Sequence, residues 1–277
     1  MRISVIVSTF NSPKSLNKAL IGYRCQTVKD FEIVIADDGS TSETADLIEK
    51  FRSETGVQLV HVRHDHQGFR KTVILNKAIT ASSGDYLIFT DGDCIPRKDF
   101  VRRHAKAARP SCFTTGMFHR LPPQTSESIT HEDIVSGACF RPKWLQEHGY
   151  TSQEDLTKLA IPPFFAPIVD FASRNRPHWA GGNSAAWRRD IIAVNGFNEK
   201  MRYGGEDTEF GVRLMNFGVR VIRVRNSAVV LHMEHERPYR SEEEFASNRA
   251  VIEESRKNGT ICCEEGLIKR SLTAAGG

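Results

Sequence analysis

The 277-residue sequence has no CxxC pair, no long apolar run and no glycine-rich phosphate loop. Its six cysteines, at positions 25, 94, 112, 139, 262 and 263, lack the spacing of a zinc knuckle or a disulfide framework. No segment approaches the roughly 18 to 20 consecutive apolar residues that span a bilayer. These absences argue against a metal-stapled domain, a disulfide scaffold and a membrane-spanning chain.

Neither sign of charge dominates. Lys and Arg total 38 against 34 Asp and Glu, so the formal net charge is only +4. Such an excess suits an anionic small molecule or an acidic membrane surface, and it is too small to argue for nucleic acid. Because Met1 and Arg2 lead directly into an apolar segment, no secretory signal is visible. We therefore expect a cytoplasmic protein, with peripheral association at the inner face of the membrane left open.

The first half of the sequence alternates strand and helix patterns. Such alternation predicts an α/β fold with a mixed, mainly parallel central sheet flanked by helices. The motif Ser40-x-x-Glu43 predicts a capping box at the start of the second helix. The expected strands are Ile3–Val7, Phe31–Ala36, Val57–Val62 and Tyr86–Thr90, and a helix over Gly68–Ala81 precedes the last of them.

The second half is less regular at first. Residues 110–176 contain two Pro-Pro pairs and many phenylalanines, and we expect loops and short helices that cover a cleft. Regular patterns return with a helix over Glu206–Phe217, with Phe217 facing inward. A strand segment over Val219–Leu231 and a closing helix over Glu242–Lys257 follow.

Acidic residues follow two of the expected strands. Asp37 and Asp38 come after the second strand, and Asp91 and Asp93 come directly after the fourth. Open α/β sheets bind ligands at the carboxyl ends of their strands. The Asp37-Asp38-Gly39 segment is equally explained as a turn. Two carboxylates at Asp91 and Asp93 repel each other unless a cation joins them, which indicates Mg²⁺ or Mn²⁺ held together with phosphate oxygens.

Three segments of the first half carry a family resemblance. Val5–Asn11, Asp37–Ser40 and Asp91–Asp93 stand in an order and spacing that resemble family 2 inverting glycosyltransferases. The resemblance implies the GT-A fold, a Rossmann-like nucleotide-diphospho-sugar transferase fold. It also implies transfer of a sugar from a nucleotide diphosphate donor.

Three segments of the second half extend the resemblance. Trp179–Asn183, Gly196–Glu199 and Tyr203–Asp207 are similar to the C-terminal module of animal β-1,4-galactosyltransferases, polypeptide N-acetylgalactosaminyltransferases and bacterial chondroitin polymerases. The implied organisation is a nucleotide-sugar-binding half over residues 1–110 and an acceptor-binding, catalytic half of the same domain over 111–240. A C-terminal helix and tail then occupy 241–277.

The resemblance implies a metal-dependent hexosyltransferase. Galactose or N-acetylgalactosamine would pass from a UDP-sugar to a saccharide or lipid-linked saccharide in bacterial polysaccharide or lipopolysaccharide synthesis. One alternative is a catalytically inactive sugar-binding or scaffolding subunit. Another is a sugar-1-phosphate nucleotidyltransferase, although such enzymes carry a glycine-rich, arginine-bearing loop after the first strand, where this chain has Ser8–Pro13.

The same resemblance implies roles at the reaction centre. Asp207 matches the catalytic base, and Glu206 beside it would contact the acceptor. Asp93 and His235 would hold Mn²⁺ or Mg²⁺, and His232 stands where animal galactosyltransferases have a second ligand. The alternative for Asp207, at the start of a helix, is a capping or first-turn acid, and the alternative for the two histidines at a strand end is a surface pair.

A further set of residues would bind the nucleotide sugar. Asp38 would contact uracil, with Ser8 and Thr9 in the same pocket, and Asp91 would lie near the ribose. Family members carry an Arg-Asn pair where this chain has Leu75-Asn76, so Arg70 or Lys71 would take the missing contact, unless both lie on a solvated helix face. The full expected set is Ser8, Thr9, Asn11, Asp38, Gly68, Arg70, Lys71, Asp91, Gly92, Gly182 and Tyr203.

Two departures concern other side chains. Tyr203 replaces a tryptophan of the animal enzymes, which leaves the sugar preferences open. His64-Asp65-His66 resembles a metal motif, but it precedes a helix and is better explained as a polar loop.

Overall fold

The computed structural model describes residues 1–173, 178–235 and 241–269. Within these ranges the strands form a seven-stranded sheet of order β3-β2-β1-β4-β8-β6-β9 and a three-stranded sheet of order β5-β10-β7. The strands are β1 (Ile3–Thr9), β2 (Glu32–Asp37), β3 (Leu59–Arg63), β4 (Tyr86–Asp91), β5 (Cys94–Pro96), β6 (Cys112–Thr115), β7 (Met117–Arg120), β8 (Ser184–Trp187), β9 (Arg220–Arg223) and β10 (Val229–His232).

Helices connect and cover the strands. They are α1 (Pro13–Arg24), α2 (Ser42–Thr55), α3 (Lys71–Ala81), α4 (Phe100–Ala107), α5 (Pro123–Ser128), α6 (His131–Ser136), α7 (Pro142–Glu147), α8 (Gln153–Leu159), α9 (Ala166–Ala172), α10 (Arg188–Ala193), α11 (Glu206–Asn216) and α12 (Glu242–Asn258), with a 3₁₀ turn at Ala138–Phe140. None of the helices in the described ranges combines the length and apolar composition needed to cross a bilayer.

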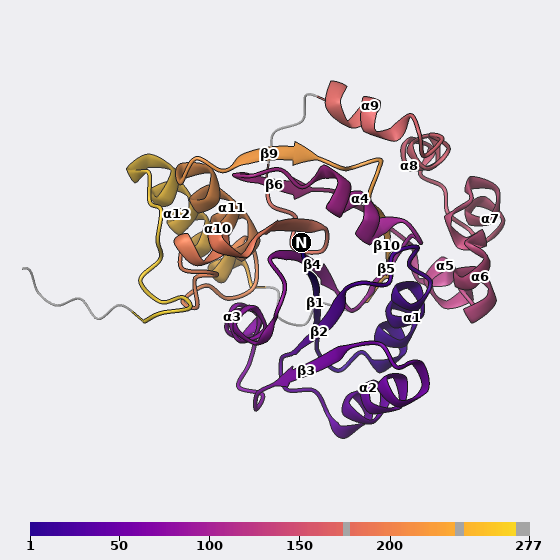
Figure 1. Cartoon of the computed structure of the whole chain (residues 1–277), viewed down its shortest axis with the longest axis horizontal. Coiled ribbons are helices and arrows are strands. Elements are labelled where there is room, and N and C mark those ends of the chain that lie inside the picture. Colours follow the sequence, from indigo (N-terminus) through magenta and orange to yellow (C-terminus); the bar gives the residue numbers. More distant parts are fainter. Residues whose placement is uncertain (174–177, 236–240, 270–277) are drawn as a thin grey trace, which may run out of the picture.

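The large sheet is buried on both faces. Successive side chains of a strand point to opposite faces, so Val5 and Val7 of β1 pack with α1, α2 and α4, whereas Ile6 packs with α3. Helices α10 and α11 cover the same face as α3, and Figure 1 shows the two helical layers on either side of the sheet. Because both faces need apolar residues, the central strands are continuous apolar runs.

The sheet is mixed, as expected from the sequence. β1, β2, β3 and β4 are parallel neighbours, β8 runs antiparallel to β4 and β6, and β6 pairs in parallel with β9. The fold is the predicted α/β arrangement, with a mixed and mainly parallel sheet between helices. Strands from both halves of the chain therefore share one sheet. Helix α12 packs on the outside of α11, where Ile252 and Val212 belong to one apolar cluster.

One predicted strand is two. The segment expected as one strand over residues 219–231 divides into β9, at the edge of the large sheet, and β10, at the centre of the small sheet. The chain turns between them, and Ser227 there donates hydrogen bonds to Asp170. Because of this break, His232 at the end of β10 lies near Asp93, just after β4, rather than at the outer edge of the large sheet.

The middle region also differs from expectation. It contains the strands β6 and β7 besides the short helices, because β6 joins the large sheet, where Phe113 is buried, and β7 joins the small sheet. Helices α6, α7 and α8 form a separate apolar cluster with β10. Of the described residues in this region, Phe118 and Arg120 of β7 line the main cavity, whereas no residue of the short helices does, so the region borders the cleft through β7 alone.

Two local predictions are also wrong. Helix α2 is capped at Thr41, without a side-chain hydrogen bond, while the Ser40 hydroxyl accepts a hydrogen bond from the backbone of Asn11. The capping box is absent because Ser40 joins two loops instead. Phe217 follows the last residue of α11 and is 44% exposed, because the chain leaves the helix there. The expected loose tail lies outside the described residues from position 270 onward.

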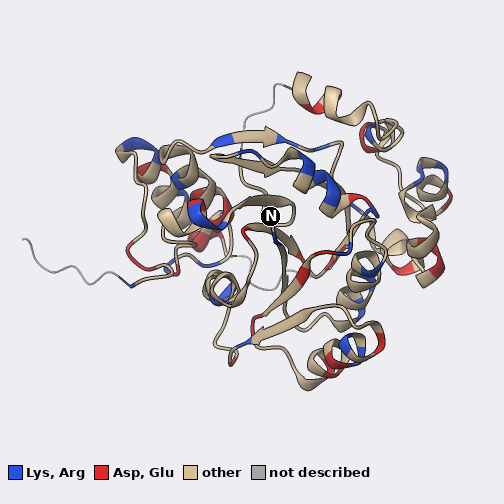
Figure 2. Ribbon diagram, in the orientation of Figure 1, with Lys and Arg blue, Asp and Glu red and all other residues tan. Residues whose placement is uncertain are grey.

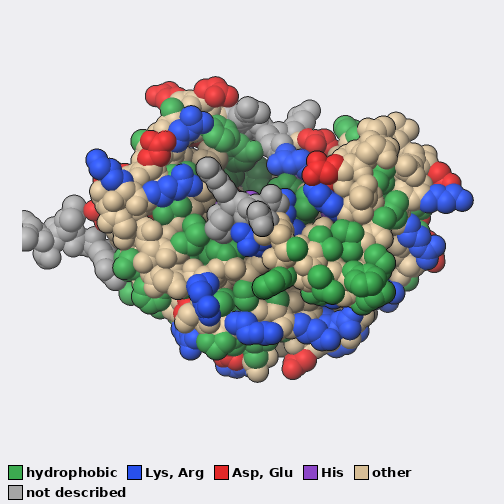
Figure 3. Space-filling model, turned by 90° about the horizontal axis from the view of Figure 1, so that it is seen from above, with side chains coloured by type: hydrophobic (Ala, Val, Ile, Leu, Met, Phe, Trp, Pro, Cys, Tyr) green, Lys and Arg blue, Asp and Glu red, His purple; other side chains and the backbone are tan. Residues whose placement is uncertain are grey.

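Charged and apolar residues are distributed unevenly over the surface. Figure 2 shows Lys and Arg on α4 and β9, on the side of the molecule that carries α9. Seen from that end, hydrophobic side chains gather over the region of α9, with Lys and Arg side chains beside them (Figure 3).

Candidate active site

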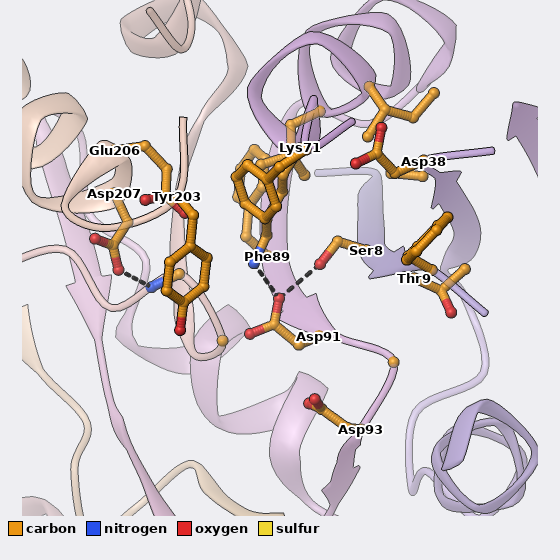
Figure 4. Close-up of a pocket in the computed structure, with 18 of the residues that line it drawn as sticks. Ser8, Thr9, Asp38, Lys71, Phe89, Asp91, Asp93, Tyr203, Glu206 and Asp207 are labelled. Carbon is orange, nitrogen blue, oxygen red and sulfur yellow. Dashed lines mark hydrogen bonds and ion pairs between the residues drawn. The ribbon is translucent and has the colours of Figure 1, made fainter. Parts of the chain in front are cut away.

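A cavity of about 710 Å³ opens at the carboxyl ends of β1, β2 and β4. Its wall includes residues from the β1 and β2 loops, the start of α3, the turn before β8, the start of α11 and the end of β10. This is the position at which open α/β sheets bind ligands. Figure 4 shows Asp38 and Thr9 on one side, Glu206 and Asp207 on the other, and Asp91 between them.

Asp91 forms the centre of the cavity wall. Its Oδ1 accepts a hydrogen bond from Ser8 Oγ at 2.6 Å and lies 2.6 Å from Lys71 Nζ, both drawn in Figure 4. Burial opposes the charge of Lys71, but Asp91, Glu206 and Asp207 outweigh it and raise the lysine pKa above its usual range. Lys71 is therefore a permanent cation among carboxylates.

The Asp37-Asp38 pair divides into one structural and one cavity residue. Asp37 is fully buried, accepts a hydrogen bond from Ser40 N and contacts His61 at 2.9 Å, so it stabilises the turn. Asp38 lines the cavity. Asp37 therefore matches the explanation of this motif as a turn, and Asp38 matches its explanation as part of a ligand site.

Asp38 is held rigidly. Its Oδ1 accepts a hydrogen bond from His64 Nε2 at 2.6 Å, and its Oδ2 accepts one from the backbone N–H of Arg70 at 2.9 Å. His64 is almost fully buried, and within the part of the chain that the structure describes its Nδ1 has no hydrogen-bond partner. The polar loop is thus part of the support of the site, which its sequence alone did not indicate.

The two histidines converge on Asp93. His235 Nε2 lies 2.9 Å from Asp93 Oδ2, and His232 Nε2 lies 3.7 Å from Oδ1. Cys94 Sγ, 3.6 Å from Asp93 Oδ1, lies in the same group. Burial acts to raise the pKa of Asp93, yet the hydrogen bond from His235 and the charge of His232 bring it below its usual value. Asp93 is accordingly a carboxylate.

These side chains fit a divalent cation. One carboxylate and two imidazoles form a mixed oxygen and nitrogen donor set, which a first-row divalent ion can accept. The His232 Nδ1 atom is buried and has no hydrogen-bond partner among the described residues, and its Nε2 lies 3.7 Å from the carboxylate. Asp93, His232 and His235 are therefore the residues that would hold the metal.

The start of α11 supplies the second acidic group. Asp207 Oδ2 accepts the N–H of Gly181 at 3.0 Å, shown in Figure 4, and its Oδ1 accepts the N–H of Thr208 at 2.7 Å. Glu206 Oε2 accepts the N–H of Gly204 at 2.9 Å. Helix N-termini favour negative charge, so both carboxylates stand where the backbone can support them.

Glu206 is the perturbed member of this pair. Burial and the charge of Asp207 raise its pKa to about 7, against the opposing effect of Lys71. Near neutral pH, Glu206 therefore exchanges between its protonated and ionised forms. Such a group at a cavity wall can donate or accept a proton in a reaction.

Two glycines permit the acidic groups to approach the turn before β8. A Cβ on Gly182 would lie 2.9 Å from Asp91 Oδ2, and one on Gly181 would lie 3.3 Å from Asp207 Oδ2. The turn is fixed from behind by Asn183, which bonds to Met117 O and Ala228 O and accepts from His104. A larger residue at position 181 or 182 would therefore crowd the carboxylate of Asp207 or Asp91.

Aromatic rings form the remaining wall. Tyr203 packs edge-to-face against Phe69 at 5.4 Å and against Phe245 at 5.8 Å, measured between ring centroids. All three residues line the cavity. The sequence pointed to Tyr203 alone, because Phe69 and Phe245 belong to segments that become neighbours only in the folded chain.

The structure brings most of the predicted site residues together. Gly68 and Arg70 do not line the cavity, and the Arg70 guanidinium bonds to Gln67 at 2.8 Å. Lys71 therefore takes the position that the sequence left open between the two basic residues. The predicted residues that line the cavity are Ser8, Thr9, Asn11, Asp38, Lys71, Asp91, Gly92, Asp93, Gly182, Tyr203, Glu206, Asp207, His232 and His235.

Comparison with protein families decides the class. The family model for glycosyl transferase family 2 matches residues 4–179, more than half of the chain. The chain belongs to this family. A second model, described as the N-terminal domain of galactosyltransferase, matches residues 171–236, which include the Gly181-Gly182 turn and the acids of α11. The protein is thus a glycosyltransferase, rather than the sugar-1-phosphate nucleotidyltransferase considered from its sequence.

Individual proteins agree with this assignment. The chain is 24% identical to the uncharacterized glycosyltransferase YfnE of Bacillus subtilis, over 98% of this chain and 72% of that protein. It is also 24% identical to the chondroitin synthase of Escherichia coli, over 84% of this chain and 34% of that protein. The glycosyltransferase chain thus spans about a third of that synthase.

A solved structure confirms the fold. GalNAc-T7 with UDP, GalNAc and Mn²⁺ superposes with a TM-score of 0.63 at 16% sequence identity, over 91% of this chain and 48% of the other. At this identity the likeness establishes the GT-A fold of the glycosyltransferase, as predicted from its motifs.

Proposed function

We propose that this glycosyltransferase transfers a hexose, with inversion, from a UDP-sugar to a carbohydrate acceptor and depends on Mn²⁺ or Mg²⁺. The observation that carries the proposal is the convergence of three groups in one cavity: Asp38 at one end, the Asp93–histidine group below Asp91, and Glu206 with Asp207 at the other end. A base-binding site, a cation site and a proton acceptor are what such a transfer requires.

The favoured sugar is galactose or N-acetylgalactosamine. The match of residues 171–236 to the galactosyltransferase model supports it, as does the presence of UDP and GalNAc in the GalNAc-T7 structure. The chondroitin synthase among the relatives supports a setting in bacterial polysaccharide or lipopolysaccharide synthesis, with a saccharide or lipid-linked saccharide as acceptor. A cytoplasmic location, at the inner face of the membrane, belongs to the same proposal.

In this proposal the two halves of the chain bind different substrates. Residues 1–110 bind the nucleotide through Asp38, Ser8 and Thr9, and residues 111–240 bind the acceptor and carry the base. The support is the position of these side chains at opposite ends of the cavity (Figure 4). Residues 241–277 contribute Phe245 of α12 to the aromatic wall.

Asp207 removes the acceptor hydroxyl proton as that oxygen attacks the anomeric carbon. Hydrogen bonds from Gly181 and Thr208 fix the orientation of its carboxylate, and a second lone pair on Oδ2 is available to the hydroxyl. Glu206, with its pKa near 7, contacts the acceptor and can donate a hydrogen bond to it. Lys71 pairs with Asp91 at 2.6 Å and reduces the repulsion among the acids.

A divalent cation at Asp93, His232 and His235 would neutralise the charge that develops on the leaving diphosphate. Asp38 accepts a hydrogen bond from the uracil ring N–H through a lone pair that His64 and Arg70 leave unused. Tyr203 and its aromatic neighbours bound the space for the sugars and exclude water from it.

The test is a donor screen that measures released UDP or GDP. The purified chain is incubated with UDP-galactose, UDP-N-acetylgalactosamine, UDP-glucose, UDP-N-acetylglucosamine or GDP-mannose and mixed saccharide acceptors, in Mn²⁺ or in EDTA. We expect turnover with one of the first two donors, in Mn²⁺ alone. Preference for GDP-mannose would refute the role of Asp38, and equal turnover in EDTA would refute the role of the metal.

A matched pair of variants locates the cation. Asp93→Ala removes the carboxylate between the two histidines, so Mn²⁺ should no longer raise the melting temperature in the presence of UDP. Asp46→Ala removes an exposed carboxylate on α2 and should leave that shift unchanged. If both variants respond to Mn²⁺ with UDP like the parent chain, the cation binds elsewhere. Donor binding without transfer to any acceptor would instead favour an inactive sugar-binding subunit.

A further inference from the structure

Helix α9 presents its apolar side to solvent. A surface helix normally buries its apolar face and exposes its polar face. In α9 the only charged residue, Asp170, is 2% exposed, whereas Phe171 beside it is 92% exposed. Helix α9 therefore buries its charged residue and exposes apolar residues, the reverse of the usual arrangement.

This reversed arrangement has a defined anchor. Asp170 Oδ1 accepts hydrogen bonds from Asn226 N at 2.7 Å and from Asn226 Nδ2 at 2.8 Å. Its Oδ2 accepts hydrogen bonds from Ser227 N at 3.0 Å and from Ser227 Oγ at 2.5 Å. Four bonds to the turn between β9 and β10 hold one side of α9 against the protein, which leaves the opposite side facing outward.

The exposed side chains form one surface. Of the eleven exposed large hydrophobic residues in the described chain, five lie within eight consecutive positions. We call these five the α9 surface; they are Phe164 (71% exposed), Phe165 (49%), Ile168 (64%), Val169 (40%) and Phe171 (92%). Figure 3 shows hydrophobic side chains gathered in this region of the molecule. A contiguous apolar surface of this kind marks an interaction site.

Positive charge borders the α9 surface. Strand β9, which packs against α9, begins with Arg220 and ends with Arg223, and Arg225 directly precedes the anchoring Asn226. The segment from 220 to 225 contains three arginines and no acidic residue. Arg220 is exposed, and Figure 2 shows these cations and those of α4 on the same side as α9. An apolar tip beside cations is complementary to an anionic lipid surface.

We infer that the α9 surface docks the protein on an anionic lipid bilayer. The three phenylalanines expose the equivalent of about two whole side chains, or roughly 300 to 500 Å², and Ile168 and Val169 add the equivalent of about one more. A stable protein interface buries about 800 Å² on each partner, so the surface is small for a second copy of this chain. A bilayer needs no such area, because protruding rings enter the headgroup region while arginines contact anionic lipids.

The inference does not depend on the donor or on catalysis. It deepens one part of the proposed function, since docking would bring the cavity to the surface where a lipid-linked acceptor resides. Vesicle binding is measured without nucleotide sugar. Failure of binding and failure of transfer are therefore separate results.

The experiment is co-sedimentation of the full chain with vesicles of phosphatidylcholine alone or mixed with phosphatidylglycerol. We expect binding to the mixed vesicles that weakens as salt is raised, and much weaker binding to phosphatidylcholine. The double variant Phe164→Ser/Phe171→Ser should bind the mixed vesicles at least about tenfold more weakly, because it loses the two most exposed rings. Arg220→Glu should weaken binding to the same vesicles in low salt.

The matched control is Phe217→Ser, which removes a phenylalanine that is 44% exposed directly after α11, a helix that Figure 1 shows well apart from α9. It should bind like the parent chain, and thermal melts should show all variants folded, since the altered side chains are exposed. Equal vesicle binding by the double variant and the parent overturns the inference, as does a parent chain that binds no vesicles. A concentration-dependent dimer that Phe171→Ser abolishes would instead make the surface an interface between two copies.

Discussion

Glu206→Gln should change the pH dependence of stability in a direction that identifies this carboxyl group. In the folded protein the pKa of Glu206 is about 7, against 4.5 for an ordinary glutamate. Between these values the native state binds a proton that the unfolded state releases, so the stability contributed by this group falls as pH rises. Glutamine cannot ionise, and its side-chain oxygen can still accept the Gly204 N–H.

The size of this change in the free energy of unfolding follows from the raised pKa of Glu206. A rise from 4.5 to about 7 corresponds to a loss of about 3 kcal/mol once both states are ionised, at 1.36 kcal/mol per pKa unit. About 2 to 3 kcal/mol of it is lost between pH 5 and pH 8. Relative to the parent chain, Glu206→Gln should therefore be more stable at pH 8 by that amount than it is at pH 5.

The assay is urea unfolding of both proteins at pH 5 and pH 8, in EDTA and constant salt. Glu253→Gln, an exposed position on α12, is the control and should follow the parent chain at both values. The decisive quantity is the difference between the two pH values, because it cancels any constant effect of the substitution. If Glu206→Gln and the parent chain show parallel stability at pH 5 and pH 8, the carboxyl has an ordinary pKa and the account of the Glu206–Asp207 pair is wrong.

Three further predictions concern the cavity. Asp207→Asn should lower turnover at saturating donor and acceptor by about 100-fold or more with little change in donor affinity, measured by steady-state kinetics beside a donor titration; near-normal turnover would move the base to Glu206. UDP should inhibit about tenfold or more better than CDP, because Asp38 cannot accept a hydrogen bond from the cytosine ring nitrogen; equal inhibition constants would remove Asp38 from base recognition. Gly182→Ala should cost about 1 to 3 kcal/mol in urea unfolding and weaken donor binding, because its Cβ displaces Asp91 from Lys71; an unchanged donor affinity would mean that the pair does not shape the site.

The sequence by itself determined the class of fold and half of the residues that line the cavity. Apolar runs followed by acidic residues place Asp38, Asp91 and Asp93 at strand ends, and parallel strands bring their carboxyl ends to one edge of a sheet. That inference is local, because each residue needs only its own strand. The position of Glu206 and Asp207 at a helix start is equally local, and the structure confirms it.

The tertiary structure decided which neighbouring side chains act together. Arg70 and Lys71 are adjacent and equally basic, but the start of α3 turns Lys71 toward Asp91 and leaves Arg70 with Gln67. His64 bonds to Asp38, 26 positions away, only because β2 and β3 are paired. Such choices depend on helix phase and strand pairing, which short patterns do not contain.

The largest errors fall where packing overrides pattern. The apolar segment after α11 looks continuous, yet it divides between two sheets, because β9 completes an edge and β10 enters a centre. Phenylalanines are typical core residues, and Phe164, Phe165 and Phe171 could be expected in a core. Four hydrogen bonds to Asp170 instead hold the polar side of α9 against the protein, so these rings are exposed. Composition records how apolar a segment is, whereas long-range contacts decide which surface it faces.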